Sequence, residues 1–348
     1  MKLLPRIVSI GTANPGRRYT QAELVSLFGA AMDRRIAMLF KNSHIESRFL
    51  CLPEPGPDGK IPTETPLQLA QKHRTNALWA GAKAIGAALE PAGLKPSDVD
   101  SFVCVTSTGF LCPSLTAWFI KELGFRADCH RADIVGMGCN GGLNGLQPVV
   151  NYCALNPQGV GLLLCVEVCT AAYVFDNTIR TAVVNSLFGD GAAAAVIATR
   201  DQAPGPKIHG FSSHIITDAI GAMRFDFDGE KQSFFLDRDI PYILGQNVDK
   251  PVDKLLGKFG LKRRDIKHWV IHSGGRKVID SIKYCLNITA HDVRHTDGVL
   301  RDYGNLSSGS FLFSHKRLID EGVAKPGEHI MMMTMGPGST VECCLGEF

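Results

Sequence analysis

Short apolar runs alternate along the chain with longer stretches in which apolar residues recur at helical spacing. The runs of strand length are residues 6–11, 101–106, 161–167, 193–198, 268–272 and 330–335. The helical patterns between them include residues 66–90, 139–154, 251–259, 276–286 and 307–320. Continuous apolar strands are typical of a sheet that helices cover on both faces. The pattern therefore predicts an α/β fold with a layered core.

The same succession of elements occurs in both halves of the chain. Residues 94–107 resemble residues 261–274 at an offset of 167, because in both a Leu-Lys pair precedes an aspartate and an apolar strand. The glycine-led strand at 159–167 matches 327–335 at an offset of 168. Matches that recur at nearly one offset predict a duplicated fold with a pseudo-twofold axis.

The repeat pairs a cysteine with an asparagine. Cys139 matches Asn305 at an offset of 166, and both come directly after a glycine. We expect one half, residues 1–205, to carry Cys139, and the other, residues 206–348, to carry Asn305. Ligands gather at strand ends and helix starts in α/β layers, and His272 ends a strand. We therefore expect these three side chains to meet near the pseudo-twofold axis.

Composition limits the class of protein. The 348 residues are 45% hydrophobic and 20% charged, with a net charge of only +3, which suits a large buried core and gives no sign of nucleic-acid binding. Pro5 and Arg6 interrupt any N-terminal signal sequence. The longest uncharged run, 134–166, contains four asparagines, so we interpret it as a buried helix and strand rather than a membrane span. These features predict a soluble, cytoplasmic protein.

The eleven cysteines include no C-x-x-C pair and no spacing typical of zinc ligands. Most are expected to be small core residues, because free cysteine is among the most buried residue types. No G-x-G-x-x-G motif follows the first strand, which argues against a dinucleotide-binding protein.

Cys139 has surroundings that could make it a nucleophile. Gly136, Gly138, Gly141 and Gly142 crowd it, and glycines permit a sharp turn with close backbone approach. Backbone N–H groups at a helix start stabilise a thiolate or an oxyanion, and they lower a cysteine pKa. A small core cysteine in a tightly packed helix would have the same pattern.

His272 and Asn305 have both chemical and structural interpretations. His272 could pair with Cys139 as a base, or it could be a buried histidine with a structural hydrogen bond. Asn305 could donate a hydrogen bond to an oxyanion or enolate, or it could cap a helix. Because the repeat places both residues near Cys139, the chemical interpretation is favoured for all three.

Several segments, in order along nearly the whole chain, resemble the type III polyketide synthase (chalcone synthase-like) family of the thiolase superfamily. They are GMGCNGGLNG at 136–145, SLFGDGAAAAVI at 186–197, WVIHSGG at 269–275, YGNLSSGSFLF at 303–313 and MGPGSTVE at 335–342. The last is similar to the family's Gly-Phe-Gly-Pro-Gly loop, with Thr334 and Met335 in place of its first two residues. The resemblance implies a thiolase-like fold with a duplicated αβαβα layered core.

The resemblance also implies roles for individual residues. It makes Cys139, His272 and Asn305 a catalytic triad. It makes Phe188 and Phe234 the two gatekeepers between a CoA tunnel and the cavity. Further substrate-contacting positions implied by the match are Ser107, Cys112, Ala172, Ser307, Gly336, Pro337 and Gly338. Cys112 lies on the loop that reaches a partner subunit in this family.

The family's chemistry is implied as well. Cys139, held as a thiolate by an imidazolium at His272, would carry the growing acyl chain. His272 and Asn305 would stabilise the enolate formed when malonyl-CoA loses carbon dioxide. We expect no metal and no cofactor beyond the CoA thioester substrates, which are malonyl-CoA and, as a further candidate, an acyl-CoA starter. A homodimer is implied, with dehydratase-type accessory enzymes as further candidate partners, and with neither a membrane nor a nucleic acid as a partner.

The residues after Cys139, from Asn140 to Asn144, are most similar to bacterial synthases that make 3,5-dihydroxyphenylacetyl-CoA from malonyl-CoA alone. Another type III synthase with a pyrone, resorcinol or naphthalene product is the first alternative. A ketoacyl-ACP synthase III-like enzyme is a second, although Leu306-Ser307-Ser308 differs from its usual motif. A degradative thiolase would need a second active-site cysteine among glycines, and Cys343-Cys344 lacks them. A non-catalytic partner of this fold would typically have lost Cys139.

Four basic residues near the N-terminus are candidates for contacts with the CoA phosphates. They are Arg34, Arg35, Lys41 and Arg48. The alternative is that these charges form a solvated helix face.

Overall fold

The computed structural model describes residues 3–28, 33–57, 61–172, 178–200, 203–228 and 231–348. Its centre is a nine-stranded mixed sheet. In spatial order the strands are β11 (Ile266–Ile271), β12 (His329–Gly336), β13 (Thr340–Glu347), β8 (Lys207–Ile215), β1 (Arg6–Ala13), β7 (Gly191–Ala198), β6 (Val160–Glu167), β4 (Ser101–Thr106) and β5 (His130–Val135). All six strands predicted from the sequence belong to this sheet.

The two halves of the chain contribute matching halves of the sheet. From the centre outward, β7 is antiparallel to both of its neighbours, β1 and β6, and β4 is parallel to β6. In the other half, β8, β13 and β12 run antiparallel and β11 is parallel to β12. Only Arg6 and Lys207 pair where β1 and β8 meet. This repeated order agrees with the predicted duplication.

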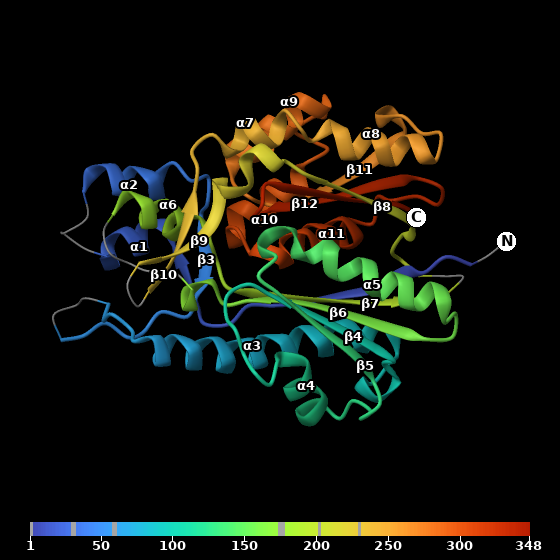
Figure 1. Cartoon of the computed structure of the whole chain (residues 1–348), viewed down its shortest axis with the longest axis horizontal. Coiled ribbons are helices and arrows are strands. Elements are labelled where there is room, and N and C mark those ends of the chain that lie inside the picture. The colour runs from blue at the N-terminus through green and yellow to red at the C-terminus, as the bar shows by residue number, and fades with distance from the viewer. Residues whose placement is uncertain (1–2, 29–32, 58–60, 173–177, 201–202, 229–230) are drawn as a thin grey trace.

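Helices cover both half-sheets and also separate them. Figure 1 shows α5 (Gly141–Leu155) and α11 (Ser310–Glu321) in the central layer between the two half-sheets. Below the lower half-sheet lie α3 (Pro66–Leu89) and α4 (Leu115–Leu123), and above the upper one lie α8 (Asp249–Lys258) and α9 (Arg276–Leu286). Because both faces are covered, all eight residues of β7 are buried. The predicted αβαβα layering of an α/β fold is thus confirmed.

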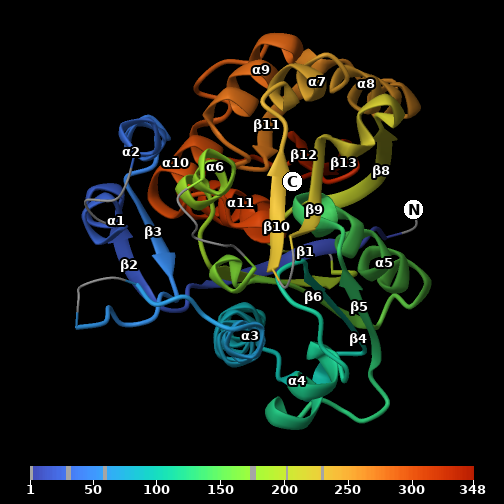
Figure 2. The ribbon, with the colours of Figure 1, turned by 60° about the vertical axis from the view of Figure 1, so that its left-hand side comes forward.

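The remaining helices and strands lie outside the nine-stranded sheet. They are α1 (Gln21–Phe28), α2 (Arg34–Lys41), α6 (Ile179–Leu187), α7 (Ile240–Gly245), α10 (Arg294–Tyr303), the strand pair β2 (Arg17–Thr20) and β3 (Ser47–Leu50), and the hairpin β9 (Met223–Asp228) and β10 (Lys231–Leu236). Among them, α2, α6, α7, β9 and β10 border the cavity described below. Figure 2 shows α1, α2 and the β2–β3 pair together beside α6. The predicted boundary between residues 205 and 206 falls just before β8, and the division into two units stays a prediction.

The pairing of Cys139 with Asn305 across the repeat is wrong. Three pairs of elements begin 169 residues apart. They are the 3-10 turns η3 (Gly138–Asn140) and η7 (Ser307–Gly309), at 138 and 307, the helices α5 and α11, at 141 and 310, and the strands β6 and β12, at 160 and 329. At this offset the counterpart of Cys139 is Ser308. The sequence match failed because the spacing between strand and helix differs between the halves, so the offset of 167 in the first match does not extend to the helix start.

None of the helices in the described ranges is both long enough and apolar enough to cross a membrane. The uncharged run at 134–166 instead forms the end of β5, then α5 and β6.

The burial of His315 leads to a prediction about the stability of the folded protein in acid. It lies on α11 with no exposed surface, and neither ring nitrogen has a hydrogen-bond partner among the described residues. Burial, with smaller contributions from His268 and His295, lowers the pKa of His315 to about 3. The unfolded chain therefore takes up this proton below about pH 6.5 and the folded chain does not, so the free energy of unfolding falls by about 1.4 kcal/mol per pH unit between the two values.

We expect His315→Phe to remove this part of the acid sensitivity. Between pH 6.5 and 5 the variant should lose about 2 kcal/mol less stability than the native chain. Urea unfolding at both pH values measures the difference, and His291→Phe, at an exposed histidine, is the matched control. An unchanged pH dependence in His315→Phe would show that this ring does not resist protonation.

Candidate active site

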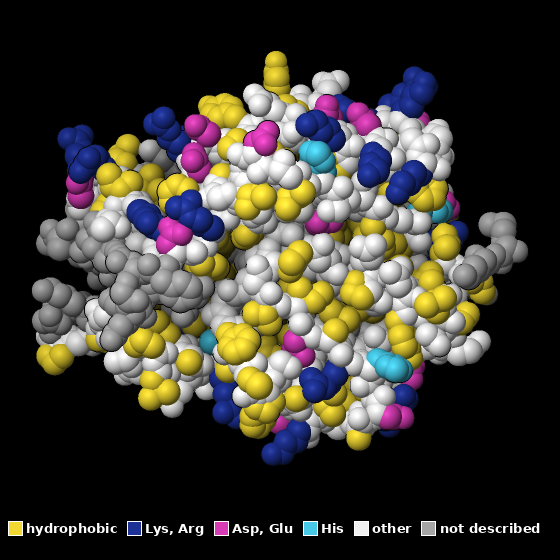
Figure 3. Space-filling view, in the orientation of Figure 1, with side chains coloured by type: hydrophobic (Ala, Val, Ile, Leu, Met, Phe, Trp, Pro, Cys, Tyr) yellow, Lys and Arg dark blue, Asp and Glu magenta, His cyan; other side chains and the backbone are white. Residues whose placement is uncertain are grey.

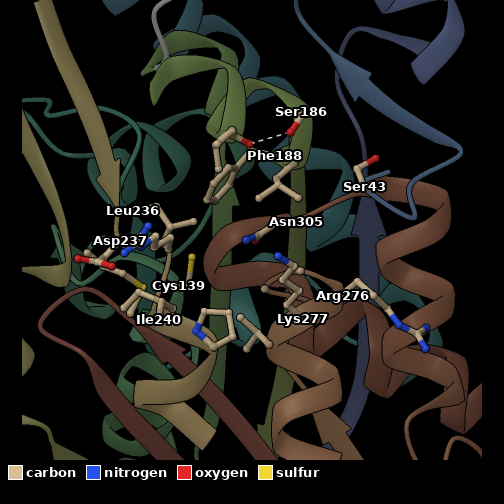
Figure 4. Close-up of a pocket in the computed structure, with 18 of the residues that line it drawn as sticks. Ser43, Cys139, Ser186, Phe188, Leu236, Asp237, Ile240, Arg276, Lys277 and Asn305 are labelled. Atoms are coloured by element: carbon tan, nitrogen blue, oxygen red, sulfur yellow. Dashed lines mark hydrogen bonds between the residues drawn. The ribbon is translucent and has the colours of Figure 1, made fainter. Parts of the chain in front are cut away.

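Cys139, His272 and Asn305 line one cavity of about 370 Å³, together with Phe188 and Phe234. Its walls come from α2, α6, β10, α7 and the start of α9. Figure 4 shows the Cys139 sulfur pointing into the cavity between Leu236 and Asn305. The structure thus brings together the three residues that the sequence singled out, from segments far apart in the chain.

A glycine-rich turn allows another loop to lie directly over Cys139. Gly138 has φ +68°, and a Cβ added there would lie 2.4 Å from the Pro337 ring. A Cβ on Gly336 would lie 2.9 Å from the Cys139 backbone nitrogen. Side chains at these glycines would push the 335–338 loop away. The loop and the turn therefore hold Cys139 in place at the start of α5.

Asn305 is oriented by its own loop. Its Oδ1 accepts a hydrogen bond from the Ser307 backbone N–H at 2.8 Å, which fixes the rotation of the amide. Figure 4 shows the amide nitrogen turned towards the Cys139 sulfur. The backbone of Asn305 is held on both sides, because its N–H donates to the Leu187 carbonyl and its carbonyl accepts from the Gly189 N–H. The amide is thus positioned to donate into the cavity.

His272 follows β11 directly, and its backbone N–H donates to the Met333 carbonyl at 2.9 Å. The side chain is 2% exposed, and its Nδ1 has no hydrogen-bond partner among the described residues. Burial lowers the pKa of His272 to about 3, which favours the neutral ring. A neutral imidazole next to the cavity can accept a proton.

Burial also governs the Cys139 thiol. It raises the Cys139 pKa to about 12, although hydrogen bonds from Ser307 and Asn305 act in the opposite direction. The Cys139 Sγ lies 3.6 Å from the Ser307 Oγ. Burial thus favours the neutral form of each side chain when it is considered alone. The ion pair between Cys139 and His272 that the resemblance implied stays a prediction.

Glu167 is a buried acidic residue of the site that the sequence analysis missed. It has no exposed surface and accepts hydrogen bonds from the Ser107 N–H at 2.8 Å, the Ser308 hydroxyl at 2.6 Å and the Ser307 hydroxyl at 3.2 Å. Burial raises the pKa of Glu167, and these donors oppose the rise. The signal in the sequence was a single charge that ends an otherwise apolar strand.

The two predicted gatekeepers lie together. The rings of Phe188 and Phe234 are 5.9 Å apart and nearly perpendicular, at 81°. Both side chains are buried and border the cavity. Because aromatic edges and faces attract in this arrangement, the pair forms a stable apolar wall beside Cys139.

Other predicted substrate-contacting residues do not border this cavity. Ser107 and Ser307 bind Glu167, and Cys112 is exposed on the surface next to Pro113. Ala172 is buried at the end of a 3-10 turn. The loop Gly336-Pro337-Gly338 packs on the glycine turn at Gly138. Contact between these residues and a substrate stays a prediction.

The assignment of Arg48 to CoA phosphates is wrong. Arg48 is 1% exposed, and its guanidinium donates only to groups inside the protein. A phosphate on the surface cannot reach it. Arg34, Arg35 and Lys41 lie exposed on α2, whose C-terminal end borders the cavity, so their contact with CoA stays a prediction.

Three basic residues at the cavity were missed. Arg238, Arg276 and Lys277 line it, and Figure 4 shows Arg276 and Lys277 side by side at the start of α9. Arg276 pairs with Asp280 and Asp297, and Arg238 lies beside Asp239. Lys277 has no ion pair or hydrogen bond to the described residues. Lys277 could have been found in the sequence because it belongs to a basic pair, Arg276-Lys277, directly after Gly274-Gly275.

Comparisons with known proteins agree with this site. A family model described as chalcone and stilbene synthases, C-terminal domain, matches residues 208–346, and one described as FAE1/type III polyketide synthase-like protein matches residues 52–209. The 3,5-dihydroxyphenylacetyl-CoA synthase of Amycolatopsis balhimycina is 51% identical over 345 residues, which are 98% of this chain and 92% of that protein.

Solved structures show the same fold. The crystal structure of PKS-I from the brown alga Ectocarpus siliculosus aligns with a TM-score of 0.92 and 26% identity, covering 100% of this chain and 99% of that one. The 1,3,6,8-tetrahydroxynaphthalene synthase of Streptomyces coelicolor aligns with a TM-score of 0.91 and 26% identity, covering 99% of both chains.

Proposed function

This chain belongs to the type III polyketide synthases, a family of acyltransferases, and on that basis we propose that it assembles 3,5-dihydroxyphenylacetyl-CoA from malonyl-CoA alone. The observation that carries the proposed chemistry is that Cys139, His272 and Asn305 line one buried cavity. The proposed product rests on the 51% identity with a synthase of that name over nearly the whole chain.

Loading begins with proton transfer from Cys139 to His272. The thiolate that this transfer forms is the nucleophile for the thioester carbonyl. The sulfur attacks that carbonyl, and the Asn305 amide and the protonated imidazole donate to the oxyanion. When the tetrahedral intermediate collapses, the C–S bond to CoA breaks and the CoA thiolate takes the proton from His272. The acyl group is now a thioester on Cys139.

Chain extension uses the same two hydrogen-bond donors, now to stabilise the charge of an enolate. When the next malonyl-CoA loses carbon dioxide, the electron pair of the broken C–C bond becomes an enolate. The Asn305 amide and the His272 ring N–H donate to its oxygen. The enolate carbon attacks the acyl thioester on Cys139, a C–C bond forms, and the thiolate is released for the chain to return to it. Side chains and the thioester itself carry every step, so the proposed cycle requires no metal or redox cofactor.

Phe188 and Phe234 contribute through their apolar rings. Their surface next to the cavity excludes water, which would otherwise hydrolyse the Cys139 thioester. An apolar surface also favours neutral carbon dioxide over the malonyl carboxylate. Decarboxylation therefore proceeds where the carboxylate is least solvated.

Incubation of the enzyme with labelled malonyl-CoA as the sole substrate tests the product. We expect 3,5-dihydroxyphenylacetyl-CoA, or its uncyclised precursor, identified by mass spectrometry against a synthetic standard. A tetrahydroxynaphthalene or a pyrone would keep the family chemistry but reject the proposed product. Absence of any malonyl-dependent product, with common acyl-CoA starters added as well, would reject both.

Lys277 is proposed to bind a phosphate of the incoming CoA thioester. It lacks a carboxylate partner among the described residues and lies at the start of α9, where backbone N–H groups also favour an anion. A hydrogen bond to a charged group contributes about 1.5–3 kcal/mol, so Lys277→Ala should raise the KM for malonyl-CoA about tenfold with little change in kcat. The matched control is Lys258→Ala, at an exposed lysine on α8. Equal KM values for both variants would exclude this contact.

We also propose that the enzyme is a homodimer. The edge strand β5 has a free side and is largely exposed, and the hydrophobic side chains of Phe110, Val135 and Met137 are 80%, 44% and 36% exposed near it. Figure 3 shows hydrophobic side chains spread over this face, with the charged ones mainly towards its rim. Such a surface is typical of an interface. Light scattering should give twice the mass of one chain, and a monomer at micromolar concentration would contradict the proposal.

A cytoplasmic location fits the proposed substrate and the thiol chemistry. All eleven cysteines are free, and ten of them are buried or partly buried. Free thiols in this number are typical of proteins from a reducing compartment.

A further inference from the structure

Arg48 is a buried cation that forms no close ion pair among the described residues, although the buried Asp190 carboxylate stabilises its charge from beyond ion-pair distance. It lies on β3, and its hydrogen bonds run only to neutral oxygens: Nε and Nη2 donate to the Gln21 side chain at 3.2 and 2.9 Å, and Nη1 donates to the carbonyls of Asn185 and Phe188 at 2.7 and 2.5 Å. Within the described residues, no carboxylate oxygen lies in ion-pair distance of its guanidinium. Burying such a charge is costly, so its partners must hold it firmly.

Together with Asp190, the two carbonyls explain why a cation is stable there. Asn185 lies in the last turn of α6, and Phe188 follows that helix directly. Carbonyls at the C-terminal end of a helix lack partners within the helix and carry the negative end of its dipole. The Arg48 guanidinium therefore caps α6 from inside the protein. The Phe40 ring, 5.8 Å from the guanidinium carbon, covers it on another side.

The stem of Arg48 contacts the loop that carries Asn305. A Cβ added to Gly304 would lie 2.7 Å from the Arg48 Cδ, so only glycine leaves room for this side chain. The backbone of the next residue, Asn305, pairs with Leu187 and Gly189 on either side of Phe188. One arginine thus touches both segments that hold a cavity residue: the end of α6 with Phe188, and the 304–305 loop with the catalytic amide.

We propose that Arg48 is a positioning residue for chain extension, which sets the Phe188 ring and the Asn305 amide relative to Cys139 by fastening the end of α6 to the 304–305 loop. The inference rests on the proposed function, because it assigns Arg48 to the condensation step. It also replaces the CoA-phosphate role expected from the sequence. Misplacement of reacting groups by about 1 Å costs up to about a hundredfold in rate, so a loosened fastening has a kinetic effect without any lost substrate contact.

Arg48→Lys tests the proposal with the charge retained. Lysine has three donors on one nitrogen and cannot span the Gln21 side and the carbonyl side as the planar guanidinium does. We expect kcat per folded enzyme to fall at least about tenfold, with the KM for malonyl-CoA changed less than about twofold. The folded fraction is measured by circular dichroism. Arg18→Lys, on the exposed side of the neighbouring strand β2, is the matched control and should leave both constants unchanged.

Two results would overturn the proposal. If Arg48→Lys lowers the melting temperature but leaves kcat per folded enzyme unchanged, Arg48 is only a structural residue. If it raises KM with kcat unchanged, Arg48 acts on substrate binding instead. Arg48→Met, which keeps the length of the stem, should show a larger loss of kcat than Arg48→Lys, and a smaller loss would also contradict the account.

Hydrogen exchange separates failure of this inference from failure of the proposed function. In Arg48→Lys the backbone amides of 187–189 and 304–306 should exchange faster, while those of α3 stay protected. This measurement needs no substrate. Unchanged exchange in both segments would reject the positioning role even in an active enzyme, whereas a native enzyme that forms no malonyl-dependent product would reject the proposed function alone.

Discussion

Replacing Cys139 by alanine should lower the rate of malonyl-CoA-dependent product formation by at least about ten-thousandfold. The proposed cycle forms and breaks a thioester at this sulfur in every round, and no other nucleophile is proposed to take its place. The side chain is small and 8% exposed, and the glycine turn around it does not depend on sulfur. Alanine should therefore leave the fold intact.

A second buried cysteine provides the control for this loss. Cys343 lies on β13 in the same hydrophobic cluster as Cys139 and is 1% exposed. Cys343→Ala should cost some stability but keep kcat within about twofold, since the lost volume is the same and the chemistry is untouched. If Cys139→Ala condenses malonyl units at a rate close to that of Cys343→Ala, the nucleophile assignment is wrong.

Asn305→Asp should lower kcat about a hundred- to thousandfold, because it removes one donor and places an acceptor in its position. The aspartate can still accept from the Ser307 N–H, as the asparagine Oδ1 does at 2.8 Å, so the loop keeps its internal hydrogen bond. The second carboxylate oxygen replaces the amide nitrogen that faces Cys139. It repels both the thiolate and the enolate, which accounts for a loss larger than that of a missing hydrogen bond.

The loss in Asn305→Asp should appear in both half-reactions. Rapid-quench measurement of acyl transfer to Cys139 and of carbon dioxide release should show both slowed. Asn287→Asp, at the exposed C-terminal end of α9, introduces the same charge away from the cavity and should leave both rates unchanged. A normal rate of carbon dioxide release in Asn305→Asp would show that this amide does not stabilise the enolate.

The layered core could be predicted from the sequence because its strands are buried on both faces. Strand β7 reads as an unbroken run of small apolar residues, and α9 runs from Arg276 to Leu286 as its periodicity predicts. Strand β8 was missed, because its alternating polar residues, KIHGFSSHI, give no apolar run. The β9–β10 hairpin was missed for a similar reason, since charged residues occur in both strands.

The same distinction holds for the residues of the site. Some can be recognised from their neighbours in sequence, and others only from contacts with residues that are distant in sequence. Cys139 and His272 stand out because glycines and strand ends lie next to them in sequence. Arg48 could not be placed, because its two carbonyl partners are 137 and 140 residues away and carbonyls leave no mark on the sequence. Glu167 similarly acquires its role from serines of two segments that are distant from it in sequence, at 107 and at 307–308.

Mass analysis of the peptide that contains Cys139, after rapid quenching of the enzyme with malonyl-CoA, tests the central claim most directly. The account predicts a series of acyl adducts on this peptide that differ by one ketide unit, and none on the corresponding peptide of Cys139→Ala. It also predicts that the adducts disappear as the cyclised product accumulates. Product formation without any adduct at Cys139, or with the ketide series on another cysteine such as Cys112, would contradict it.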